Sequence, residues 1–212
     1  MLSNNFWLKG LVGQAVAYNA PGTEQAAKFD PANGLLVSPF RGAYAELARN
    51  NRVFFASAAA VTLPVNASSL ASKFGVYNPP NSGVNLELIN ATAHAVVATT
   101  VVDALGLYYS NGTNATGATF TTQGTVQNRN VGGPSGAAQF YSAVTHVGTP
   151  VLLDLIGGWG AVTDGGSTEI SKDFNGSVIV PPGTLLALAM TTAASTASGI
   201  TLGMSWAEIP IQ

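Results

Sequence analysis

The stretch Ile200-Thr-Leu-Gly-Met-Ser-Trp206 shows the pattern that decides the fold. Large apolar side chains occupy every second position, and small or polar side chains occupy the positions between them. Because successive side chains of a β-strand point to opposite faces, we predict a strand with one face in a core. The stretch Thr184-Leu-Leu-Ala-Leu-Ala-Met190 is apolar on both faces, so we expect a partner subunit or the N-terminal residues to cover its second face. We expect these two strands to pair with each other.

Similar strand-like runs recur from Arg52 onward, and clusters of Gly, Pro, Asn and Ser separate them. The runs follow one another at roughly 8–14 residues, a spacing typical of antiparallel sandwiches and barrels rather than of βαβ units. There is no convincing internal repeat and no long helical pattern, so the sequence predicts an all-β antiparallel sandwich. The expected strands are residues 52–57, 61–65, 72–77, 84–88, 93–99, 100–109, 119–126, 138–147, 150–156, 176–180, 184–190 and 200–206, with a loop at 110–117.

Residues 1–52 differ from the rest of the chain. They hold five of the eight basic residues, contain three prolines and lack sustained alternation. A short helix is predicted over residues 43–49 and ends at Asn50-Asn51. We therefore expect an N-terminal arm, residues 1–52, and a β-sandwich domain, residues 53–212. The arm is rich in aromatic residues, so it packs either on its own domain or on a neighbouring subunit; the interface residues expected in the second case are Phe6, Trp7, Leu8, Tyr44 and Leu47.

Charged residues are unusually sparse. They make up 8 % of the 212 residues, against roughly 25 % in ordinary soluble domains. A folded monomer of this size would expose on the order of 9,200 Å², which leaves about one charge per 500 Å². We therefore expect a homo-oligomer, most simply a trimer, in which other subunits cover part of the surface. A net charge of −2 gives no basic footprint for nucleic acid, and the uncharged stretch 174–207 is broken by Pro181-Pro182-Gly183, so no membrane span is predicted.

The residues offer little for catalysis. The chain has no cysteine, which excludes disulfides, thiolate catalysis and zinc–cysteine sites. A metal or general-base site could be built from His94 and His146 with Asp103 or Asp154, because these residues fall on neighbouring predicted strands. Two unrelated strand histidines are the preferred interpretation. No nucleophile elbow, phosphate-binding loop or calcium loop occurs, so we predict no enzyme, no catalytic residue, no cofactor and no metal.

Two C-terminal segments carry a family resemblance. In Ser177-Val-Ile-Val-Pro-Pro-Gly-Thr-Leu-Leu-Ala-Leu-Ala189 a Val-Pro-Pro-Gly-Thr turn opens a strand of small residues. The segment Ile200-Thr-Leu-Gly-Met-Ser-Trp-Ala-Glu-Ile-Pro210 ends on a Trp-x-Glu-x-Pro motif. Together they resemble the closing strands of jelly-roll virion proteins of tailed bacteriophages. The resemblance implies a jelly-roll sandwich and a trimeric capsid decoration (cement) protein that binds the major capsid protein on the virion surface, with assembly in the host cytoplasm.

The sequence is compatible with three functions. The first is a non-enzymatic structural virion protein that stabilises a phage head by binding between capsomers. The second is a receptor- or glycan-binding tail or fibre module, which would need exposed aromatic rings; its candidates are Tyr108, Tyr109 and Trp159. The third is a sandwich-fold hydrolase, for which the chain has too few titratable groups. The first function is the preferred one.

Overall fold

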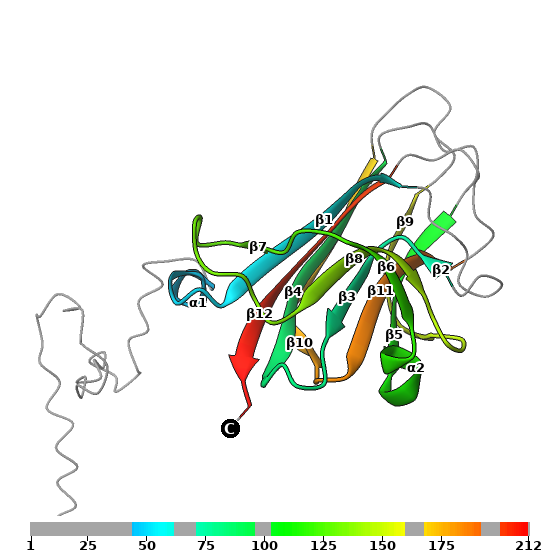
Figure 1. Ribbon diagram of the computed structural model, residues 1–212. Helices are drawn as coiled ribbons and strands as arrows, with labels where there is room; N and C mark the ends of the chain where they lie inside the picture. The colour runs from blue at the N-terminus through cyan, green and yellow to red at the C-terminus, as the bar shows by residue number, and fades with distance from the viewer. Residues whose placement is uncertain (1–43, 62–70, 96–102, 160–167, 192–199, 212) are drawn as a thin grey trace, which may run out of the picture. The chain divides into compact units, whose positions relative to one another are not determined.

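The structure is a computed structural model that describes residues 44–61, 71–95, 103–159, 168–191 and 200–211, all within the second of two compact units, Tyr44–Gln212. These ranges form two antiparallel sheets and two short helices (Figure 1). The five-stranded sheet has the order β10 (Thr168–Val180), β4 (Val84–Ala95), β12 (Ile200–Pro210), β1 (Val53–Val61) and β7 (Gln127–Asn128). The seven-stranded sheet has the order β2 (Ala71–Ser72), β8 (Gln139–Thr145), β3 (Gly75–Asn78), β11 (Thr184–Met190), β5 (Asp103–Asn111) and β9 (Val151–Trp159), and β6 (Thr119–Gln123) also pairs with β8. The helices are α1 (Ala45–Arg49) and α2 (Gly112–Thr116).

Four strand pairs are nested along the chain. β1 pairs with β12, β3 with β11, β4 with β10 and β5 with β9, all antiparallel. The first and third pairs lie in the five-stranded sheet, and the second and fourth lie in the seven-stranded sheet. The chain is therefore a long antiparallel ribbon wound so that successive pairs alternate between two sheets. This is the arrangement of a jelly roll, and it confirms the predicted all-β, jelly-roll-like sandwich.

The core lies between the sheets, and β12 supplies its centre. Ile200, Leu202, Met204 and Trp206 are each at most 1 % exposed, as their alternation predicted. The Trp206 ring stacks on Phe54 of β1, with 6.4 Å between the ring centroids. Because β12 pairs with β1 on one side and β4 on the other, this row of side chains joins the start, middle and end of the chain in one core.

Both faces of β11 are covered, as predicted, but the domain covers them itself. Every residue from Thr184 to Met190 is buried, and alternate ones, beginning with Leu186, join the central core. On the opposite face Leu185 packs in a second cluster with Ala115 of α2 and Ala118. The expectation that a partner subunit or the N-terminal residues cover this face is therefore wrong at Leu185. The region expected to be only a loop, residues 110–117, contains α2, which provides part of the cover.

The predicted pairing of the last two strands is also wrong. β11 lies in the seven-stranded sheet between β3 and β5, whereas β12 lies in the five-stranded sheet between β1 and β4. Both edges of each strand are thus occupied by earlier strands. Alternation shows which face of a strand is apolar, but the nested ribbon decides which strand lies beside it.

β10 is longer than predicted because it contains a bulge that resembles a turn in the sequence. Asn175 and Gly176 have positive φ angles of 50° and 81°, and the register with β4 shifts between Asp173 and Val178. An Asn-Gly pair is a strong turn signal, since both residues tolerate left-handed backbone. Here it bulges a continuous strand. The strand expected at 61–65 runs mostly through residues outside the described ranges.

The short helix predicted over residues 43–49 is confirmed as α1. Its Leu47 and the preceding Tyr44 are half-buried against an apolar cluster of the five-stranded sheet. The compact unit begins at Tyr44, and the boundary expected at residue 52 stays a prediction. Neither helix in the described part of the chain has the length and apolar character needed to cross a membrane.

Two residues of the Trp-x-Glu-x-Pro motif, Trp206 and Glu208, have different structural roles in this fold. Trp206 fills the core, and the buried Glu208 carboxylate accepts hydrogen bonds from the backbone N–H groups of Ala137 at 2.8 Å and Ala138 at 2.9 Å. Any side chain at Gly136 would collide with this carboxylate, so the position requires glycine. Glu208 therefore fastens the segment before β8 to β12.

Replacing Trp206 with alanine should destabilise the domain by about 3–5 kcal/mol, because the ring fills the centre of the core. Urea denaturation measures the loss. The matched control is Val131→Ala, at a side chain that is 96 % exposed, which should change the free energy of unfolding by less than about 0.5 kcal/mol. Equal stability of the two variants would show that the register of β12 is wrong.

Candidate functional site

A row of exposed aliphatic side chains marks one edge of the domain. Val151, Leu152, Leu153 and Leu155 of β9 are between 43 % and 52 % exposed, and we call these four residues the β9 strip. β9 ends the seven-stranded sheet, where β5 is its neighbour (Figure 1). A contiguous apolar patch marks an interaction surface far more often than single exposed residues do. The other large apolar side chains exposed in the described ranges are Val131, Val147, Ile179 and Ile211.

The strip is exposed because β9 pairs irregularly with β5. Leu155 lies opposite Gly106 and Leu152 opposite Tyr108. The register shifts once between these two pairs and once more between Leu155 and Gly157. A bulge leaves a residue unpaired and bends its strand. In a regular strand, every second side chain would point into the core. At a bulge this alternation is interrupted, so neighbouring side chains of β9 can both be exposed. Ile156, which one of the register shifts leaves without a partner residue on β5, is 7 % exposed and belongs to the central core.

Covering the strip would contribute favourably to association with a partner. Complete burial of one such side chain contributes roughly 1.5–3 kcal/mol, so covering the exposed halves of four contributes roughly 3–6 kcal/mol per copy before the cost of association. The edge strand of the other sheet differs, because β10 carries Glu169, Lys172 and Asp173. Charged residues on an edge strand discourage contact with other chains. Of these two edges, β9 exposes the larger number of aliphatic side chains.

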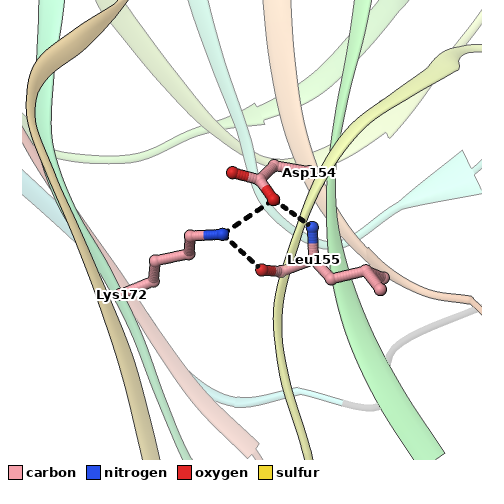
Figure 2. A network of polar contacts seen from close by, with 3 residues as sticks. All are labelled: Asp154, Leu155 and Lys172. Atoms are coloured by element: carbon pink, nitrogen blue, oxygen red, sulfur yellow. Dashed lines mark hydrogen bonds and ion pairs between the residues drawn. The ribbon is translucent and has the colours of Figure 1, made fainter.

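A polar network ties β9 to β10 beside the strip (Figure 2). Lys172 Nζ donates to Asp154 Oδ1 at 2.7 Å and to the carbonyl oxygen of Leu155 at 3.0 Å. The same carboxylate oxygen accepts the backbone N–H of Leu155 at 2.7 Å. The hydrogen bond from Lys172 holds the pKa of Asp154 below its usual value. We call Asp154, Leu155 and Lys172 the edge clamp, because together they occupy both backbone polar groups of Leu155.

None of the interface residues predicted from the sequence belongs to the β9 strip. Phe6, Trp7 and Leu8 fall outside the described residues. Tyr44 and Leu47 lie on and beside α1, where they pack on their own domain and keep part of their surface exposed. Their role toward a partner stays a prediction. The β9 strip was missed because a run of valine and leucine is normally interpreted as core, and its exposure depends on the position of β9 at a sheet edge.

The titratable groups proposed for a metal or general-base site are not brought together. His94 is exposed on β4 of the five-stranded sheet, whereas His146 follows β8 of the other sheet and is buried. Asp154 is bound to Lys172, and the side chain of Asp103 lies outside the described residues. No group of three His, Asp or Glu side chains within the described ranges is arranged to hold a metal ion.

His146 instead forms a buried polar pair. Its Nδ1 lies 3.1 Å from Ser110 Oγ, and the two residues are only 4 % and 5 % exposed. Burial lowers the pKa of the imidazole, because the charged form would lose its hydration. A serine–histidine pair is one part of a nucleophilic site, but both residues of this pair are buried in the domain rather than presented at its surface.

The aromatic candidates for glycan binding are not exposed loop residues. Tyr108 is 4 % exposed on β5, and Tyr109 packs against the core from the same strand. The backbone of Trp159 ends β9, and its side chain lies outside the described residues. A groove of about 840 Å³ is lined mainly by hydroxyl and amide groups, and its one aromatic ring, Phe140, is 3 % exposed. Neither Tyr108 nor Phe140 therefore presents an open ring face on which a glycan could stack.

Comparisons with known proteins add no assignment. No family model and no curated protein matches the chain. A solved structure described as "KBV activated particle at acidic pH" is similar at 12 % sequence identity, over 94 % of this chain and 86 % of that chain, with a TM-score of 0.26. An overlap this loose carries no argument about function, so the surface of the domain must carry it.

The buried imidazole makes stability depend on pH. The unfolded chain binds a proton at His146 near pH 6.5, whereas the folded chain binds it only at a lower pH, so stability should fall as the pH drops below about 6.5. His146→Gln should remove this loss between pH 7.5 and pH 5, as measured by urea denaturation. His94→Gln, at an exposed histidine on the other sheet, is the control and should retain the wild-type profile. Identical profiles for wild type and His146→Gln would contradict the burial of His146.

Proposed function

We propose that this chain is a non-enzymatic structural protein of a virion, a capsid decoration (cement) protein that stabilises a tailed-phage head by binding between capsomers. The observation that carries the proposal is the β9 strip, an apolar edge on a jelly-roll domain. A cement protein acts by burying surface between large neighbours, and this strip is surface that needs such cover.

The fold supports the proposal only in combination with the surface. Jelly rolls form viral capsid domains and also lectins and cupins, so the topology alone selects no function. A lectin would need an open ring or a ligand groove with directed polar groups, and a cupin would need clustered metal ligands. The described residues favour neither, whereas the exposed aliphatic side chains of β9 and only 18 charged residues in 212 favour a subunit that is surrounded by others.

The finer parts of the proposal extend beyond the described residues. The protein would act as a homotrimer on the capsid surface, with the major capsid protein as its partner and assembly in the host cytoplasm. Residues 1–52 would act as an anchoring arm, with Phe6, Trp7 and Leu8 as apolar contacts. In that arrangement a few aromatic side chains would supply most of the binding free energy.

Electron microscopy of phage particles from cells that produce the chain tests this function. We expect many copies on the head, visible as three-fold density between capsomers. Deleting residues 1–40 should weaken attachment to heads by at least about tenfold, or about 1.4 kcal/mol, while the domain stays folded. Absence of the chain from particles, or its presence in a few copies on the tail, would contradict the proposal. Unchanged attachment after the deletion would exclude the anchoring arm.

A further inference from the structure

The segment that connects β5 to β6 lies beside the buried pair of Ser110 and His146. Residues 111–118, which we call the cover segment, run from the last residue of β5 through α2 to the start of β6 (Figure 1). The segment begins directly after Ser110, whose hydroxyl oxygen lies 3.1 Å from His146 Nδ1. It also meets the residue after the histidine, because a methyl group added at Gly117 would lie 3.2 Å from Val147 Cγ2. The cover segment therefore contacts the chain on both sides of the histidine pair.

The cover segment has few apolar contacts with the sandwich. Of its eight residues only Ala115 and Ala118 are buried, and both pack in the cluster that contains Leu185. The N–H of Gly117 donates to the carbonyl oxygen of Thr113 at 2.9 Å, so this hydrogen bond closes α2 on itself rather than on a strand. Two alanine side chains bury little apolar surface, and segments with few buried apolar contacts open before the domain unfolds.

Among the described residues, no free carboxylate faces His146 from the elements around it. The elements α2, β3, β6, β8 and β11 contain no charged residue, Asp103 is at the opposite end of β5, and Asp154 of β9 is already in an ion pair. The titratable side chains of the neighbouring cluster are Tyr77 and Tyr141, and burial raises the pKa of both, so they stay neutral. A protonated imidazole would therefore be buried with no opposite charge to balance it.

Protonation requires the imidazole to reach water, and the cover segment is the part that can open. His146 lies between Val144 and Pro150, which are both buried and fix the backbone on either side of it. The cover segment is held by two alanines, and Gly112, with a φ of 52°, and Gly117 lie near its two ends. Glycine allows the backbone to rotate there at little steric cost. Opening of the segment would give the imidazole access to water while the strands stay paired.

We infer that residues 111–118 form an acid-sensitive cover, which protonation of His146 opens locally to expose Leu185 while the sandwich stays folded. A proton that binds the open state more tightly than the closed state shifts the population toward the open state. Leu185 and the hydroxyl of Ser110 then reach the surface, so acid creates an apolar patch that is covered at neutral pH. This device does not depend on the proposed cement function.

Hydrogen exchange of the full chain at pH 7.5 and pH 5, corrected for the intrinsic exchange rate at each pH, tests the cover. Protection of the backbone amides in the cover segment should fall by at least about fivefold at pH 5, whereas β12 should keep its protection. Unchanged protection of the cover segment would overturn the inference. Equal loss of protection in β12 would also overturn it, because acid would then unfold the whole domain.

Three variants identify the group that responds to acid. His146→Gln should give the cover segment equal protection at both pH values, because glutamine does not titrate. Ser110→Ala keeps the buried imidazole and should keep the acid response. His94→Gln, at an exposed histidine on the other sheet, is the matched control and should behave as the wild type. An acid response that persists in a folded His146→Gln variant would overturn the role of His146.

NMR titration of the His146 imidazole in the wild type needs no substitution. The protonated fraction of the imidazole and the open population of the cover segment should rise together as the pH falls, because protonation and opening are linked. Protonation of His146 without opening of residues 111–118 would overturn the inference.

Discussion

The constraint on which this structure depends is the nested pairing of its strands. β12 lies between β1 and β4, and in that position its core side chains from Ile200 to Trp206 are buried. These contacts join parts of the chain that are distant in sequence. Forming them therefore costs the conformational entropy of closing long loops. β5 and β9 form the innermost of the four nested pairs, and β9 lies at the edge of its sheet.

The surface properties follow from that position. An edge strand exposes backbone groups on one side, and a bulged edge strand also exposes side chains that regular pairing would bury. In this protein the backbone groups and the side chains of the β9 edge differ in whether they have partners. The protein satisfies the backbone of Leu155 with Asp154 and Lys172 and leaves the aliphatic strip in water. The backbone polar groups of Leu155 have partners inside the domain, whereas the aliphatic side chains beside them are exposed to water. This combination is expected of a subunit that associates through side chains rather than through its backbone.

Sequence alternation predicted the sandwich, the buried row of β12 and the double cover of β11, because local periodicity records which faces are apolar. It did not predict strand partners, because an apolar face can be buried whichever strands lie beside it. The last two strands, predicted to pair, lie in different sheets. The helix α2 was missed because Gly112–Thr116 is small and polar apart from Ala115. The β9 strip could not be found in this way: valine and leucine predict core, and only the topology shows that these residues lie at an edge.

The most direct test of the central claim is the accessibility of the β9 strip in the assembled protein. The chain has no cysteine, so Leu153→Cys introduces a single thiol into the strip and Val131→Cys introduces one on an exposed loop. The rate of reaction with a thiol reagent is measured for each variant over a dilution series. We predict that the thiol in the strip reacts slowly at high concentration and speeds up on dilution, while the loop thiol reacts quickly throughout. Equal, concentration-independent rates at the two positions would contradict the account, because the strip would then be as open in the assembly as in the isolated domain.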